Sequence, residues 1–230
     1  MKKLYAAALF IILSAVTMLS APYALNIKDF TALKVNDGIN VVYKSVPDSA
    51  GWIVFDTEET MAPKILFSND KNTLKIELAT DGQPISNLPT IHVYSSVLTK
   101  AENSKDSTLT VISPTPAASI ELRIIGNGTI IAKNIHATQV KGRIDTGSGH
   151  LVINGKAKKA EFYNTGTGRI EGSGLKAEVG RCQLLGTGSI DCAISEELTV
   201  IGAGSGTIYL EGKPKIKKRA LGVKIVQTEE

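Results

Sequence analysis

Six ionisable residues in the second half of the chain are of the types that act on acidic sugars. They are Arg143, Asp145, His150, Arg169, Glu171 and Asp191. Some enzymes of β-helical fold cleave such sugars with arginine, lysine and aspartate side chains gathered on one face. The same residues on a flat surface would form solvated ion pairs, which contribute little. Their role therefore depends on the elements that position them.

Pairs of glycines, each pair enclosing one small polar residue, recur through the same region. The pairs are Gly126 and Gly128, Gly147 and Gly149, Gly166 and Gly168, Gly186 and Gly188, and Gly204 and Gly206. A phosphate-binding glycine loop opens a helix. Because no helical pattern follows any of these pairs, we interpret the glycines as corners of the backbone, where φ is positive.

The chain offers no pattern for a metal or a cofactor. His92, His136 and His150 lack metal-ligand spacing, and there is no CxxC or HExxH motif. Cys182 and Cys192 stand four residues from the same corner on opposite sides, so we expect both to face the core without meeting. The sequence thus predicts no cofactor, no metal site and no necessary disulfide.

The corners repeat at intervals of 21, 19, 20 and 18 residues, and the residues around them align. Two positions after the second glycine of each pair stand aliphatic residues: Ile130, Leu151, Ile170, Ile190 and Ile208. A repeat of this length with no helical period is typical of a β-solenoid. Stacked coils, about 4.8 Å apart, would turn this column into an apolar core ladder. They would also place Arg169 one coil above His150, with Glu171 and Asp191 on neighbouring coils.

The first half of the chain reads differently. Residues 25–116 contain short alternating runs, which predict antiparallel strands, with a turn signal at Asn36-Asp37-Gly38. The segment Ser113–Pro116 breaks that pattern, and we place a boundary there. The solenoid is expected over residues 117–218, and residues 219–230 are expected to be a C-terminal tail.

The first 24 residues are predicted to be an export signal. Lys2 and Lys3 precede the apolar stretch Leu4–Leu19, and small residues follow. Cleavage after Ala21 or after Ala24 leaves Pro22 close to the cut, so an uncleaved anchor stays open as an alternative. We expect no other membrane span.

The formal net charge of +4 gives no argument for nucleic acid as a partner. The cationic run Lys213–Arg219 could touch lipopolysaccharide, anionic lipid or an acidic partner. It could also be a solvated tail or edge, or could protect the end of the solenoid from another chain.

The run Phe30–Ser45, which contains Gly38-Ile39-Asn40, resembles the start of the bacterial family called putative auto-transporter adhesin, head GIN domain. The repeated GSG-like corners and the closing segment Leu210–Lys218 are similar to that family as well. The resemblance covers about Asp29 to Lys218. It implies a right-handed β-helix and brings no catalytic residues. Here "RALGVKIVQ" stands where the family often has a last GSG, so the final strand is expected to differ.

Together these observations predict an all-β chain whose strand-rich N-terminal half continues into a right-handed, parallel β-helix-like solenoid of about 20-residue coils. We expect an exported, non-catalytic protein in the periplasm, on the outer surface or outside the cell. Its partner would be an envelope component, a glycan or a protein. A small enzyme acting on polysaccharide and a self-associating structural module are the alternatives.

Overall fold

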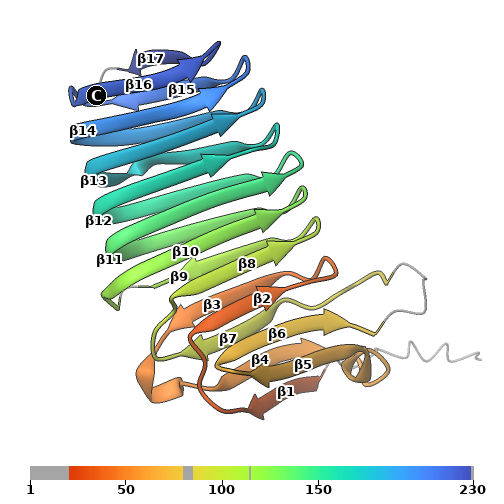
Figure 1. Cartoon of the computed structure of the whole chain (residues 1–230). Coiled ribbons are helices and arrows are strands. Elements are labelled where there is room, and N and C mark those ends of the chain that lie inside the picture. The colour runs from red at the N-terminus through yellow and green to blue at the C-terminus, as the bar shows by residue number, and fades with distance from the viewer. Residues whose placement is uncertain (1–20, 80–84, 114, 229–230) are drawn as a thin grey trace, which may run out of the picture.

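The structure is a computed structural model that describes residues 21–79, 85–113 and 115–228. The predicted signal segment thus lies almost wholly outside the described residues. The described chain is a curled sheet of 17 strands, stacked as the coils of a β-solenoid (Figure 1). The prediction of an all-β solenoid with coils of about 20 residues is confirmed. No helix in the described part is long and apolar enough to cross a membrane.

The strands of the first half are short. They are β1 (Ala21–Asn26), β2 (Ala32–Val35), β3 (Val41–Ser45), β4 (Trp52–Thr57), β5 (Ile65–Asp70), β6 (Thr73–Leu78), β7 (Ile91–Ser95), β8 (Lys100–Ser104) and β9 (Thr108–Ile112). Two 3₁₀ turns, η1 (Pro47–Ser49) and η2 (Ala62–Lys64), flank β4.

The second half has longer strands that run from one glycine corner to the next. They are β10 (Ala117–Ile125), β11 (Thr129–Thr146), β12 (His150–Asn164), β13 (Arg169–Leu185) and β14 (Ser189–Ala203), followed by the shorter β15 (Thr207–Glu211), β16 (Lys215–Leu221) and β17 (Lys224–Thr228). The register of β11 to β14 shifts in mid-strand, where each strand bends around the core.

Each coil has two main sides. The pre-corner face is the side whose segments lead into a corner. It consists of β2, β6, β8, β10, the later parts of β11 to β14, and β16. The post-corner face is the opposite side, whose segments follow a corner. It consists of β3, β7, β9, β15, β17 and the first parts of β11 to β14. Neighbouring coils pair in parallel on both faces, as β10 with β11 and β11 with β12.

The core runs between the two faces. The aliphatic column is in register from coil to coil, with Ile130 opposite Leu151, Leu151 opposite Ile170, and Ile190 opposite Ile208. All five predicted ladder residues are fully buried. The column extends at both ends, to Leu109 and Val41 below Ile130 and to Ile225 above Ile208. Each coil therefore shields the apolar side chains of the next one.

The corner glycines meet two different demands. The first glycine of four pairs has positive φ, as Gly147 does at 78°, whereas Gly166 does not. The second glycine lacks room instead: a Cβ atom on Gly168 would lie 2.2 Å from the carbonyl oxygen of Gly149. Stacked corners thus need glycine both for the turn and for close packing of backbones.

The prediction of antiparallel strands in the first half is largely wrong. β2 and β3 do not form a hairpin; β2 pairs in parallel with β6 and β8, and β3 pairs in parallel with β7 and β9. Asp37 and Gly38 both have positive φ, of 62° and 76°. A turn with positive φ can begin a hairpin or can carry the chain to the next face of a coil, and here it does the latter. Antiparallel pairing is confined to β1 with β4, β4 with β7, and β5 with β6 among the described strands.

Both ends of the described part of the chain are strands. Residues 219–221 end β16 and residues 224–228 form β17, so this part of the expected tail belongs to the last coil of the solenoid. Residues Ala21–Ala24 belong to β1, which pairs with the whole of β4. Cleavage after Ala24 would therefore remove more than half of a paired strand.

Cys182 and Cys192 are free and fully buried, as expected. They lie closer together than expected, close enough that the Cys192 thiol, together with burial, raises the pKa of Cys182. Both residues face the same core.

Candidate binding faces

The six ionisable residues predicted to share a surface lie on two faces. Arg143 and Asp145 precede the Gly147 corner and lie on the pre-corner face, whereas His150 follows it. Arg169, Glu171 and Asp191 lie with His150 on the post-corner face, in register on successive coils. The corner turns the chain between these sets, and no ion pair joins them within the described chain.

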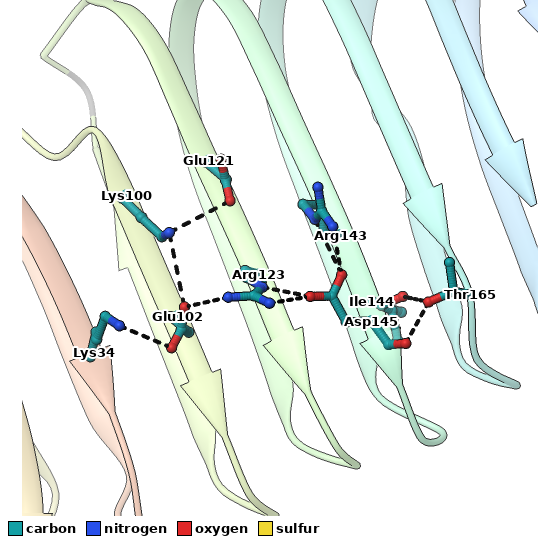
Figure 2. Close-up of polar contacts among 9 residues, drawn as sticks. All are labelled: Lys34, Lys100, Glu102, Glu121, Arg123, Arg143, Ile144, Asp145 and Thr165. Atoms are coloured by element: carbon teal, nitrogen blue, oxygen red, sulfur yellow. Dashed lines mark hydrogen bonds and ion pairs between the residues drawn. The ribbon is translucent and has the colours of Figure 1, made fainter.

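The pre-corner set belongs to a ladder of ion pairs that crosses four coils (Figure 2). Arg123 on β10 is its centre, with its Nε 2.6 Å from Oδ2 of Asp145 and its Nη1 3.1 Å from Oε2 of Glu102. Glu102 on β8 also lies 3.5 Å from Nζ of Lys34 on β2. Arg143 donates to the other oxygen of Asp145 at 3.0 Å.

A second row of charges runs parallel to the first. Lys100 lies 3.8 Å from Glu121 on the next strand and 4.0 Å from Glu102, as Figure 2 shows. The register continues this row as Lys141, Glu161 and Arg181, so positive and negative side chains alternate from coil to coil. Opposite charges directly across paired strands are favourable, and the Lys100–Glu121 pair is the closest cross-strand contact of this row.

The carboxylates of this ladder are held in their charged form. Burial opposes ionisation of Asp145, but hydrogen bonds from Arg123 and Arg143 outweigh it and lower the pKa of Asp145. Burial likewise opposes ionisation of Glu161, whereas Lys159 and the Tyr163 hydroxyl stabilise the anion and lower its pKa. A general acid at neutral pH needs the opposite shift, so neither carboxylate is suited to protonate a leaving group.

Tyr163 supplies an aromatic surface beside the ladder. Nζ of Lys141 lies 5.2 Å from the ring centroid, and the guanidinium carbon of Arg143 lies 5.4 Å from it. The Tyr163 hydroxyl donates to Glu161 at 3.1 Å. Cations over an aromatic face are stabilised by the ring quadrupole, which orders both side chains at the surface.

The post-corner set is smaller. Arg169 joins two carboxylates, at 2.6 Å to Oδ2 of Asp191 and at 3.2 Å to Oε1 of Glu171. His150 Nε2 lies 3.1 Å from the same Glu171 oxygen. The hydrogen bond to Asp191 raises the pKa of Arg169. A shallow depression beside this set is lined by Arg169, Asp191, Tyr209 and Glu211 with hydroxyl groups.

No group of three or more potential metal ligands occurs among the residues that the structure describes. The rung above His150 carries Arg169, a cation, which disfavours a metal ion at that place.

Sequence reasoning missed Lys34, Glu102 and Arg123, although they form the centre of the ladder. Lys34 and Glu102 lie in the first half, where antiparallel pairing was expected, and Arg123 precedes the first glycine corner, so none of the three belonged to the aligned repeats. The only signal was spacing: Glu102 precedes Arg123 by 21 residues, and Arg123 precedes Arg143 by 20. Those intervals match the corner repeat.

Two buried asparagines were missed as well. Asn164 is fully buried and donates from Nδ2 to the carbonyl oxygens of Gly168, at 2.7 Å, and Ser189, at 3.2 Å. Asn103 makes the equivalent bonds to Ser107 and Thr129 at another corner. Both side chains satisfy backbone groups that the sharp turns leave unpaired.

Comparison with known proteins supports the resemblance read from the sequence. A family model described as "Putative auto-transporter adhesin, head GIN domain" matches residues 29–214. No match was found among curated proteins.

Several solved structures share the fold. A "putative adhesin" from Bacteroides fragilis NCTC 9343 is 19% identical, with a TM-score of 0.80 over 91% of this chain and 95% of its own. A "putative lipid binding protein" from Parabacteroides distasonis ATCC 8503 is 19% identical, with a TM-score of 0.72 over 91% and 98%. A "putative adhesin" from Parabacteroides merdae ATCC 43184 is 18% identical, with a TM-score of 0.67 over 91% and 97%. At sequence identities of 18% to 19%, the similarity to these structures establishes the fold alone.

Proposed function

Since the chain belongs to the family described as "Putative auto-transporter adhesin, head GIN domain", we propose that it is an exported, non-catalytic binding protein of the bacterial cell envelope. Its ligand would carry anionic groups and lie along the pre-corner face. The names of the family and of three structural relatives support an adhesin-like or binding role. The apolar stretch Leu4–Leu19 supports export.

The observation that carries this proposal is the charge ladder of the pre-corner face. On β2, β8, β10 and the later parts of β11 to β13, outward positions of this face hold seven cations and four carboxylates, an excess of three positive charges. The cations are Lys34, Lys100, Arg123, Lys141, Arg143, Lys159 and Arg181, and the carboxylates are Glu102, Glu121, Asp145 and Glu161. Because the carboxylates already hold many of these cations in position, little side-chain entropy remains to be lost on binding.

A binding survey tests the proposal. The chain from Ala21 onward would be applied to an array of neutral and acidic glycans, and to vesicles of neutral and anionic lipids as a separate arm. We expect binding to acidic members, weakened at least ten-fold by Lys141→Ala with Arg143→Ala. The control is Lys156→Ala with Lys158→Ala, two exposed lysines at the bend of β12 that are not among the cations counted above. Equal weakening in both variants, or binding only to neutral members, would contradict it.

Cell fractionation tests the export part. We expect the full chain in the envelope or the medium. Unprocessed protein recovered in the soluble cytoplasm would contradict export.

A small polysaccharide-cleaving enzyme is the second candidate, and the Arg169–Asp191 pair beside the shallow depression is what favours it. Incubation with polygalacturonate and measurement of new reducing ends decides between the two. Cleavage that is lost in Asp191→Asn would establish the enzyme and displace the non-catalytic role.

A further inference from the structure

The solenoid has one closed end and one open end (Figure 1). At the N-terminal end, β4 pairs with β7 and β5 pairs with β6, both antiparallel, so they cover the outer edges of the first parallel coil. At the C-terminal end, β16 pairs with β14 and β17 pairs with β15. Among the described strands, none pairs with the other edge of β16 or β17, so their outward backbone groups are free to accept a further strand.

The side chains of β16 alternate between two environments. Lys215, Lys217 and Arg219 continue the outer surface of the pre-corner face, above Glu197, Thr199 and Ile201. Between them, Ile216 lies over Leu198 and Ala220 lies over Gly202, in line with the core. Leu198 is fully buried, whereas Ile216 is 41% exposed. The inward row of β16 therefore leaves Ile216 partly exposed at this end, and Lys218 lies between Ile216 and Ala220, over the buried Val200.

The cations of this edge are largely without carboxylate partners. Lys217 lies 2.8 Å from Glu197, but within the described residues Lys215 and Arg219 form no ion pair. Lys218 points the other way and donates to the carbonyl oxygen of Val223 at 2.8 Å, which ties β16 to the start of the β17 segment. The edge thus combines free backbone groups, exposed apolar side chains and unpaired positive charge.

We propose that the β16 edge binds an extended segment of a partner protein in which acidic and apolar side chains alternate. Backbone hydrogen bonds would add the segment as one more strand. Its acidic side chains would lie beside Lys215, Lys217 and Arg219, and its apolar side chains would cover Ile216 and Ala220. The alternation follows from the period of two along a strand.

A second copy of this chain fits the edge poorly. Antiparallel pairing of β16 with itself would place rows of cations opposite one another, which is destabilising. Continuation of the parallel stack would require an open N-terminal coil, and that end is covered by β4 and β5. Charge complementarity therefore selects an acidic partner strand.

The probe is a fluorescent, end-capped peptide of eight residues in which glutamate and valine alternate, and the readout is anisotropy at low salt with the chain from Ala21 onward. One control peptide has the same composition in two blocks, and another carries N-methyl groups on alternate peptide bonds. The test variant is Lys215→Glu with Arg219→Glu. The matched control is Lys156→Glu with Lys158→Glu, which makes the same change of charge elsewhere.

We expect the alternating peptide to bind and to protect the amides of residues 215–221 from hydrogen exchange. Binding should fall at least ten-fold in the test variant and less than two-fold in the control, with Tm unchanged in both. If the charge reversals lower Tm, Lys215→Gln with Arg219→Gln replaces them and should weaken binding three-fold or more.

No binding, equal binding of the blocked or methylated peptide, or dimerisation of the chain through this end in sedimentation velocity would each overturn the proposal. The variants Lys141→Ala and Arg143→Ala should leave peptide binding unchanged, which separates the β16 edge from the anionic-ligand site proposed on β2 to β13.

Discussion

At the scale of single residues, the buried asparagines define the corners as much as the glycines do. The Oδ1 atom of Asn164 accepts a hydrogen bond from the backbone nitrogen of Gly166 at 3.1 Å, while its Nδ2 atom serves two carbonyl oxygens. One side chain thus satisfies two backbone groups of its own corner and one on the next coil. Asn127 lies in the exposed part of another corner. Its Oδ1 atom accepts hydrogen bonds from the backbone nitrogen and the hydroxyl of Ser148, both at 3.1 Å.

Replacing these two asparagines should therefore have unequal effects. Asn164→Ala leaves buried backbone groups without partners, and we expect a loss of about 2 to 4 kcal/mol in the free energy of unfolding. Asn127→Ala should cost less than about 1 kcal/mol, because water replaces the lost bonds. Urea unfolding followed by circular dichroism measures both. Similar losses would mean that the buried bonds of Asn164 do not stabilise the corner.

The register of the core ladder gives a second residue-scale prediction. Ile170 is fully buried between Leu151 and Ile190, whereas Thr167, three residues earlier, is exposed. Ile170→Asp should cost several kcal/mol, since it buries an unpaired charge. Thr167→Asp, which introduces the same side chain into water, should cost far less. Thermal unfolding compares them, and a greater loss at Thr167 would show that the register is wrong.

At the scale of elements, the pre-corner ladder joins strands that are distant in the sequence. Arg123 on β10 connects Glu102 on β8 with Asp145 on β11, so three successive coils share one network. These side chains are only partly exposed, so removing one partner is costlier than losing a fully exposed pair. The ladder should therefore respond to pH as a unit.

Asp145→Asn tests that response. The folded-state pKa of Asp145 is lowered, so its contribution is fully present above the unfolded value of about 3.9 and is lost as pH falls through the folded pKa. We expect the variant to be about 2 kcal/mol less stable at pH 7. The difference from the wild type should shrink below about pH 4. Tm measured from pH 7 to pH 2.5 checks this, with the exposed Asp48→Asn as control; a difference that is independent of pH would contradict it.

The sequence predicted the strands best in the second half, where repeats that follow one another in the chain are also neighbours in space. The glycine pairs and the aliphatic column predicted the coils of the second half because adjacent repeats stack on one another. In the first half, β2 and β3 lie between β6 and β7 on one side and β8 and β9 on the other, an order that no local pattern encodes. The predicted surface was split for a related reason: a corner separates Arg143 from His150, and closeness in sequence does not give closeness across a turn.

At the scale of the whole molecule, the N-terminal cap determines where the solenoid begins. Tyr23 on β1 stacks on Phe55 of β4 at 5.3 Å between ring centroids, and Phe55 packs on Phe67 of β5 at 5.6 Å. This aromatic group covers the end at which the parallel coils stop. Residues 21–26 therefore contribute one side of this cap.

Deletion of β1 tests the importance of the cap. A chain beginning at Ile27 should be less stable than one beginning at Ala21 by about 2 kcal/mol or more, because Phe55, now 3% exposed, loses its cover. Differential scanning calorimetry of the two chains measures this. Identical Tm values would mean that β1 is not required and that cleavage after Ala24 is harmless to the fold.

The unequal ends have a mechanical consequence. A protein attached at its N-terminal end and pulled through a ligand at its far end would resist force as a stack of separate coils, not as one body. Because each C-terminal coil pairs only with its neighbours, tension would peel them from the open end one at a time. Each coil of about 20 residues would release roughly 70 Å of chain. Such stepwise unfolding would absorb the work of a sudden pull while the aromatic cap stayed folded, so the solenoid would limit the force that is transmitted to its N-terminal end.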